Sequence, residues 1–191
     1  MDFQNILAGI YSLPPASSRL LASAAEMVAV DKNTEIVTAG KVCRDIYLVA
    51  KGIARAFYIA DGREITFWIG AEGSVALSLR SYVDGLPGYE TIVTIEDSVL
   101  YRLPIERLET LYQEDIHIAN WGRKFAEKEI LRAEKALIPQ LFTTGRERYE
   151  VLLREQPGLL NRIPLEILAT YLGITAVSLS RIRGQIARGR S

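Results

Sequence analysis

The chain has 191 residues, with 23 Lys and Arg against 23 Asp and Glu, a formal net charge of zero and 49% hydrophobic residues. This composition is typical of a globular protein of one or two domains and excludes a disordered chain. No apolar run approaches the ~20 residues that cross a bilayer. The segment Met1-Asp2-Phe3-Gln4 has no basic n-region of a secretory signal, so we expect a cytoplasmic protein without membrane contact.

The chain has a single cysteine, Cys43, and a single histidine, His117. One cysteine allows neither an intramolecular disulfide nor a Cys-ligated iron–sulfur cluster. One histidine disfavours a metal site and a His-based catalytic triad. We therefore predict no cofactor and no enzymatic activity.

The first part of the chain, residues 4–29, has a helical pattern. The pattern breaks at Leu13-Pro14-Pro15, because proline cannot continue a helix, and it restarts at Ser17 or Ser18.

Between Thr34 and Leu103 the pattern changes to short segments rich in β-branched and aromatic residues. Asp61-Gly62 predicts a hairpin turn, since both residues tolerate positive φ. Short strands with such frequent turns indicate a closed or sandwiched antiparallel sheet. The predicted strands are Glu35–Thr38, Asp45–Ala50, Ile53–Ile59, Glu64–Ile69, Tyr89–Ile95 and Ser98–Leu103.

After Pro104 the pattern predicts a short helix, Ile105–Gln113, and a much longer one from about Asp115 to Leu141. The long helix has an apolar stripe that includes Ile118, Trp121 and Phe125. A small β domain cannot cover so long an apolar face, so we expect a symmetric partner helix and a homodimer. The alternative is a helix that lies against its own sheet.

Phe142–Gly145 is the predicted hinge to a C-terminal region, where Arg146–Glu155 forms a helix that Gln156-Pro157-Gly158 ends. Two short helices joined at Gly173 follow, which is the pattern of a helix-turn-helix. Thr175 is placed to cap the second of them. The apolar residues that stripe these helices are Leu165, Leu168 and Leu172, then Leu179, Ile182 and Ile186. An ordinary helical hairpin is the alternative.

The C-terminal end is purely basic. Residues 167–191 contain no Asp, Glu or Lys, but four arginines: Arg181, Arg183, Arg188 and Arg190. A basic end on a neutral chain predicts a local contact with a polyanion, here double-stranded DNA. A solvated basic tail is the alternative.

Motifs along nearly the whole chain resemble the Crp/Fnr family of bacterial transcription regulators, in the form found in Bacteroidetes-type bacteria. In the C-terminal part they are Glu147-Arg148-Tyr149, Pro157, Arg162-Ile163-Pro164, Ala169, Tyr171–Thr175 and Leu179–Arg183; in the N-terminal part they are Tyr47–Gly52, Arg55, Asp61–Glu64 and Trp68. The resemblance implies an α+β fold. It comprises an antiparallel β-roll of jelly-roll type resembling a cyclic-nucleotide-binding domain (residues 1–114), a long dimerisation helix (115–141) and a helical helix-turn-helix domain (142–191).

The sequence departs from the family in its phosphate-binding cassette. Ser74 stands where nucleotide-binding members have a Glu for the ribose, and Tyr89-Glu90 stand where they have the phosphate-binding Arg. Without that Arg a phosphate loses charge-assisted bonds worth roughly 1.5–3 kcal/mol each. We therefore expect no cyclic AMP binding of the usual kind, unless Arg80 substitutes. The corresponding pocket residues are Trp68, Gly73, Ser74, Val75, Ala76, Leu77, Tyr89, Glu90 and Thr91.

A second departure lies in the reading helix, where Ala176 and Val177 replace the Arg and Glu with which family members read bases. Ser178 and Arg181 remain as polar readers, and Arg181 matches the family's base-reading Arg. An arginine can bond guanine bidentately, whereas Ala176 or Val177 can contact a thymine methyl. The predicted DNA contacts are Thr175, Ala176, Val177, Ser178, Ser180, Arg181, Arg183 and Arg188, with Arg190 as a further phosphate contact.

The sequence thus predicts a homodimeric transcription regulator whose partners are double-stranded DNA, a second copy of itself and, as a further candidate, RNA polymerase. It leaves open whether the roll binds a small effector. The alternative is a ligand- or protein-binding roll whose helix-turn-helix no longer reads DNA.

Overall fold

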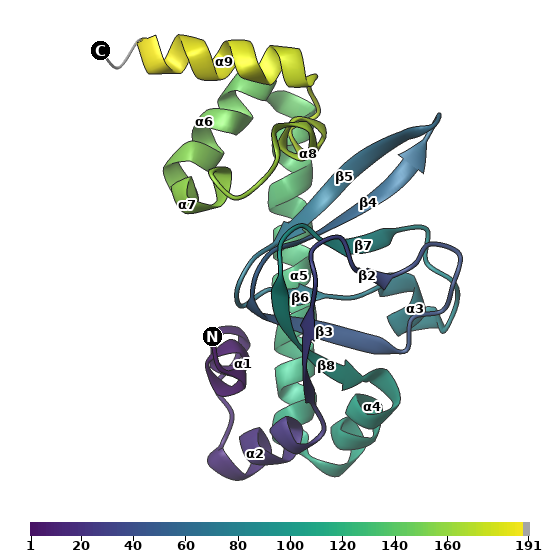
Figure 1. Ribbon diagram of the computed structural model, residues 1–191. Helices are drawn as coiled ribbons and strands as arrows, with labels where there is room; N and C mark the ends of the chain where they lie inside the picture. The colour runs from purple at the N-terminus through teal and green to yellow at the C-terminus, as the bar shows by residue number, and fades with distance from the viewer. Residues whose placement is uncertain (189–191) are drawn as a thin grey trace.

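The computed structural model describes residues 1–188. A long helix, α5 (Ile116–Phe142), runs the height of the molecule, with a β-roll on one side of it and a small helical domain at its C-terminal end (Figure 1). This arrangement confirms the predicted fold class.

Two short helices, α1 (Phe3–Ile10) and α2 (Pro15–Ser23), open the chain, and the predicted proline break lies between them. The prediction that the helical pattern continues to residue 29 is wrong. Residues 26–30 form strand β1 (Glu26–Val30), which pairs along its whole length with β8 (Ser98–Pro104). The backbone partner lies far along the chain, so tertiary pairing overrides the local helical pattern.

The roll consists of two four-stranded antiparallel sheets. The first has the order β1-β8-β3-β6, with β3 at Asp45–Lys51 and β6 at Val75–Ala76. The second has the order β2-β7-β4-β5, formed by β2 (Glu35–Val37), β7 (Thr91–Thr94), β4 (Ala54–Ala60) and β5 (Arg63–Gly70). The predicted turn between β4 and β5 is confirmed, because Asp61 and Gly62 have φ of 49° and 73°.

Helix α4 (Ile105–Glu114) follows the roll and contacts both β8 and α5. Asp115 caps α5, and its Oδ1 accepts a hydrogen bond from the His117 amide at 2.8 Å. Ile118, Trp121 and Phe125 are buried in a core shared with α1, α2 and α4. The Trp121 indole also donates to the Leu7 carbonyl at 3.1 Å.

The assignment of Ile118, Trp121 and Phe125 to the dimer face is therefore wrong. Their side chains fill the core of their own protomer, so they are not available to a partner helix. The stripe in the sequence is real, but α1 and α2 cover it. The alternative, a helix against its own sheet, fits this first half of α5, since the same core also includes Ile46 and Leu48 of β3.

The second half of α5 is different, because its large apolar side chains are exposed. Ile130 and Leu137 are 68% and 59% exposed and lie one heptad apart on one face. At ~100° per residue this face is roughly opposite the face that buries Trp121. The exposed apolar residues of this half are Ile130, Leu131, Leu137, Ile138, Leu141 and Phe142.

The C-terminal domain comprises α6 (Gly145–Glu155), α7 (Pro157–Leu160), α8 (Leu165–Tyr171) and α9 (Ala176–Arg188). Thr144 and Glu147 form a capping box at the start of α6. The apolar core of this domain continues into the roll, where it includes Ile53 and Ile95. Helix α8 packs on β5, so the domain is docked on the roll.

Within residues 1–188, no single helix has the length and apolar character needed to cross a membrane. The bent pair α8 and α9 meets those two criteria only when its helices are taken together.

Candidate nucleic-acid interface and sensor domain

The two helices α8 and α9 have the geometry of a helix-turn-helix. They are bent by 97° relative to each other, within the ~90–120° of such motifs. Gly173 has φ of +63°, a left-handed conformation that glycine adopts without strain. The Thr175 Oγ1 accepts from the Ser178 amide at 3.1 Å and so caps α9 as predicted.

The scaffold of this motif is buried as the sequence predicts. Leu168, Leu172 and Leu179 meet in the core of the domain. Ala169, also buried, lies in the same cluster. The Ala169 carbonyl also accepts from the Ile174 amide at 3.0 Å, which closes the end of α8. The turn is thus fixed by both backbone and core contacts.

The outward face of α9 carries Val177, Ser180, Arg181 and Arg188, all exposed. Val177 is 81% exposed, whereas Ala176 packs partly into the domain core. The predicted contacts therefore share one face of α9 only in part.

The remaining predicted contacts lie around this face. Arg183 is exposed and lies on the flank of α9, nearer to the buried side of the helix. The Ser178 hydroxyl is engaged by the Thr175 hydroxyl at 2.9 Å. Arg190 lies outside the described residues.

The exposed arginines of α9 form no ion pair among the described residues. Within residues 1–188, Arg181, Arg183 and Arg188 have no acidic partner. Ion pairs in this part of the chain lie on α5, on α6 and in the roll instead. An unpaired guanidinium on a convex helix is available for phosphate or guanine.

Sequence reasoning missed the role of Arg148, which ties α5 to the turn of the helix-turn-helix. Its Nε and Nη2 donate to the Leu172 carbonyl at 3.1 and 2.8 Å. Its Nη1 donates to the Pro139 carbonyl at 3.3 Å and to that of Thr143. The end of the long helix is therefore connected through one side chain to the turn between α8 and α9. The only sequence signal was its place in the motif Glu147-Arg148-Tyr149.

A second missed residue, Arg162, joins the C-terminal domain to the roll. Its Nη1 and Nη2 donate to the two carboxylate oxygens of Glu72 at 3.0 and 2.8 Å, and its Nε donates to Glu96 at 3.3 Å. The Glu72 Oε1 also accepts from the Gly52 amide at 2.9 Å. These contacts, led by the Arg162 guanidinium, lower the pKa of Glu72 from 4.5 to about 2.

This shift predicts a loss of stability in acid. A carboxyl whose pKa is depressed in the folded state stabilises the fold above its unfolded pKa, and that stabilisation disappears as pH falls from about 4.5 to about 2. Both side chains are about a third exposed, so solvent screening limits the effect to about 1 kcal/mol. Urea unfolding between pH 6 and pH 2 should show a steeper fall for the wild type than for Glu72→Gln. Glu114→Gln, at an exposed position of α4, should follow the wild type, and equal slopes for all three would contradict the prediction.

The predicted sensor pocket is not gathered around one cavity. Val75 and Ala76 are buried in β6, where they pair with β3, and the Ser74 carbonyl accepts from the Val49 amide at 2.9 Å. Trp68 packs partly against the roll core, and its ring leaves no room for a side chain at Gly70. Gly73 takes a left-handed turn with φ of +87°, and Leu77 packs against the main core. These residues build the roll rather than line an opening in it.

The remaining predicted pocket residues, Tyr89, Glu90 and Thr91, lie in different environments. Tyr89 is 65% exposed, and its ring is tilted against that of Phe67 with 6.1 Å between centroids, whereas Glu90 is only 5% exposed. Thr91 accepts from the Ala39 amide at 3.4 Å. The Glu90 Oε1 has no hydrogen-bond partner among the described residues. A buried carboxylate therefore occupies the place where family members bring a cation to phosphate.

The segment between Ser74 and Tyr89 contains one helix that the sequence did not reveal, α3 (Leu79–Asp84). Ser78 caps it, and Gly85 ends it with φ of +66°. Arg80, the candidate substitute for the missing cassette arginine, is exposed on α3. It has no ion pair in the part of the chain that the structure describes.

Comparison with known proteins identifies the fold. Residues 27–115 match the family model of the cyclic nucleotide-binding domain. FixK2 from Bradyrhizobium japonicum has a TM-score of 0.75 and 21% identity over 86% of this chain and 85% of that chain. A protein described as a Crp/Fnr-family transcriptional regulator from Eubacterium rectale has a TM-score of 0.70 and 20% identity, covering 89% and 82%. This chain has the Crp/Fnr fold.

The Crp/Fnr fold extends over nearly the whole molecule. The catabolite activator protein of Thermus thermophilus covers 96% of this chain with 87% of its own, at 22% identity and a TM-score of 0.60. A sequence comparison with curated proteins finds no match. The likeness to Crp/Fnr regulators therefore rests on the fold and on the match of the roll.

Proposed function

We propose that the chain is a cytoplasmic, DNA-binding transcription regulator of the Crp/Fnr type that acts as a homodimer. The observation that carries this proposal is the outward face of α9, where exposed arginines without acidic partners follow a capped, rigid turn. Such a helix presents its first turns to the major groove. Arg181 is the base-reading residue in this proposal, and Arg183 and Arg188 contact phosphates.

The homodimer forms through the second half of α5. Its exposed apolar stripe, from Ile130 to Phe142, suits a second copy of the same helix. Arg148 and Gln140 connect the end of α5 to the turn of the helix-turn-helix, the latter through its Nε2, 3.3 Å from the Tyr171 carbonyl. A change in the packing of two α5 helices would therefore move the two reading heads. RNA polymerase is a candidate partner of the DNA-bound dimer.

Cyclic AMP is not the effector in this proposal. The buried Glu90 carboxylate would repel a cyclic phosphate, and Ser74 is too short to replace the ribose-binding Glu.

The variant Arg181→Ala tests the DNA-reading role. On an operator selected from fragments of the source genome, we expect an affinity loss of about 5- to 150-fold, or 1–3 kcal/mol, and relaxed preference at one base position. Fluorescence anisotropy at fixed salt measures the first effect, and binding to all four bases at each position measures the second. Arg107→Ala, an exposed arginine of α4, removes the same charge far from α9 and should leave both unchanged.

The second candidate function is a ligand- or protein-binding module that does not read DNA. The exposed Val177 favours it, because an apolar residue occupies a position where related regulators carry a polar reader. If Arg181→Ala and Arg107→Ala lowered the affinity equally, DNA contact would be non-specific and this second function would be the better account.

A further inference from the structure

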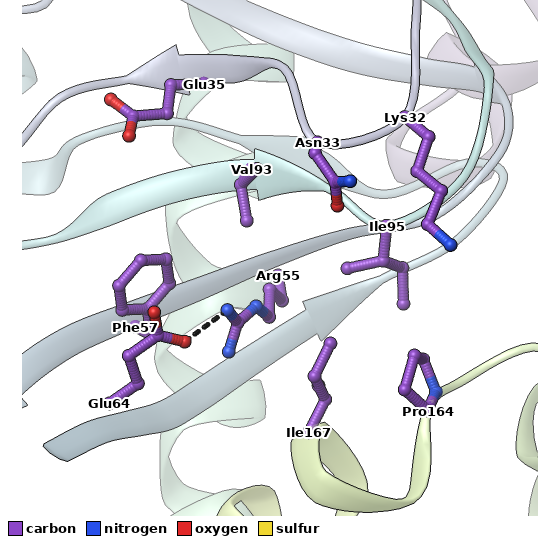
Figure 2. Close-up of a pocket in the computed structure, with 10 residues that line it drawn as sticks. All are labelled: Lys32, Asn33, Glu35, Arg55, Phe57, Glu64, Val93, Ile95, Pro164 and Ile167. Carbon is purple, nitrogen blue, oxygen red and sulfur yellow. Dashed lines mark hydrogen bonds and ion pairs between the residues drawn. The ribbon is translucent and has the colours of Figure 1, made fainter.

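A cavity of about 250 Å³ lies between the roll and the helix-turn-helix domain. Its floor is the outer face of the sheet β2-β7-β4-β5, and its far wall is the start of α8 (Figure 2). Ligand sites occur preferentially at such domain boundaries. None of the residues assigned above to the cyclic-nucleotide cassette lines it.

Arg55 lies at the centre of this cavity. Its side chain is only 12% exposed, and the guanidinium carbon lies 4.3 Å from the centre of the Phe57 ring. The Nη1 donates to the Thr66 hydroxyl at 3.2 Å, and the Nη2 pairs with Glu64. The Nε is buried and has no partner among the described residues. A buried donor on a charged group without an acceptor is costly, so an acceptor that reaches this atom after a local side-chain shift stabilises it.

Two further donors face the same space. Figure 2 shows the side chains of Lys32 and Asn33 reaching down from the turn before β2 toward Ile95. Their backbone is fixed, since the Lys32 amide donates to Asp97 at 2.9 Å and the Asn33 amide to the Thr94 carbonyl at 2.8 Å. Neither side chain has a partner within residues 1–188.

The acidic residues of the cavity do not offset these donors. Glu64 is engaged by Arg55, and the Glu35 carboxylate accepts from the Thr38 hydroxyl at 3.3 Å. In Figure 2 the Glu35 carboxylate points away from Arg55. Glu35 keeps its charge, because the Thr38 hydroxyl is neutral, but it lies on the other side of the cavity from Lys32 (Figure 2). The Lys32 end of the cavity is therefore locally positive and offers unused donors.

The apolar part of the lining comes from both domains. Val93 and Ile95 belong to the roll, whereas Pro164 and Ile167 belong to the helix-turn-helix domain. A ligand with an anionic head and a short apolar body satisfies both parts of the cavity.

We infer that this cavity binds a small organic carboxylate. The carboxylate accepts from the Arg55 Nε, the Lys32 ammonium and the Asn33 amide group, and the apolar body packs between Ile95 and Ile167. The site goes beyond the DNA-binding function and does not depend on it. Because both domains line the cavity, the bound ligand stabilises the docked position of α8 on the roll.

Hexanoate is the probe, and 1-hexanol is its neutral match of the same length. Isothermal calorimetry on the full chain should give saturable binding of hexanoate with Kd in about the millimolar range, as expected for so small a ligand. Hexanol and inorganic phosphate should bind at least about tenfold more weakly, since each lacks one half of the required chemistry. Hexanoate should also raise the midpoint of thermal unfolding.

Two variants assign the binding to this cavity. Lys32→Ala changes an exposed side chain and should weaken hexanoate about tenfold, and Arg55→Met should weaken it further. Lys41→Ala, which removes a lysine that lines a second cavity elsewhere on the roll, should have no effect. Circular dichroism checks the folding of Arg55→Met; if that variant does not fold, Lys32→Ala decides.

Three results would overturn the inference. They are the absence of saturable hexanoate binding, hexanol binding as tightly as hexanoate, and unchanged binding in Lys32→Ala. Each of these measurements is made without DNA, so failure of this inference is distinguishable from failure of the DNA-binding proposal.

Discussion

The double variant Ile130→Glu/Leu137→Glu is expected to convert a dimer into folded monomers. In a symmetric dimer four apolar side chains would leave the interface, each contributing about 1.5–3 kcal/mol when fully buried, and four carboxylates would face one another. The dimer Kd should rise at least about 1,000-fold. Sedimentation velocity over a range of concentrations measures it.

The matched control is Ala136→Glu, an exposed position on the opposite face of the same helix. It introduces a charge into α5 without touching the stripe and should leave the dimer intact. The double variant should also lose operator affinity, because a monomer contacts only one half-site. A wild-type chain that sediments as a monomer, or a double variant that remains dimeric, would contradict a dimer through this face.

The variant Trp121→Ala is expected to lower the free energy of unfolding by about 3–5 kcal/mol, because truncating a large buried aromatic leaves a cavity. Trp121 is fully buried, stacks on Phe125 with 5.9 Å between ring centroids, and donates to the Leu7 carbonyl. It therefore fastens the first half of α5 to α1. Urea unfolding followed by circular dichroism measures the loss.

Trp121→Phe separates the ring from its hydrogen bond. It keeps most of the apolar volume and leaves the Leu7 carbonyl without its donor, so we expect a smaller loss of about 1–3 kcal/mol. Neither variant should weaken the dimer at temperatures where the protein is folded. A Trp121→Ala protein of wild-type stability that sediments as a monomer would contradict this placement and indicate that Trp121 lies in the dimer interface.

The helix-turn-helix was predictable because its signals are local. A glycine with positive φ, a capping threonine and apolar residues at helical spacing are all determined within a few residues of the turn. The same holds for the Asp61-Gly62 hairpin. In these places the sequence contains both the element and its boundary.

Long-range contacts were not predictable from local patterns. The periodicity of α5 shows that Ile118, Trp121 and Phe125 share an apolar face. It does not reveal whether helices of the same chain or a second copy of α5 cover that face. Strand β1 escaped detection because its partner β8 lies at the far end of the roll sequence. Both errors come from tertiary packing that overrides propensity.

The candidate sites divide in the same way. The exposed residues of α9 follow from the helix register, so its outward face was predictable from the sequence, whereas DNA contact by that face stays a prediction. The contacts of Arg148, Arg162 and Arg55 join segments distant in sequence, and no spacing rule indicates them. The cassette residues were located by resemblance, and the structure shows that two of them, Val75 and Ala76, are buried strand residues.

DNase footprinting of the wild-type protein on the region upstream of its own gene, at low salt, tests the central claim most directly. The account predicts sequence-selective protection of two half-sites related by two-fold symmetry, with centres one helical turn, about 34 Å, apart. Arg181→Ala should lose this protection at the same protein concentration. Uniform protection of any DNA, or no protection, would contradict a sequence-reading homodimer.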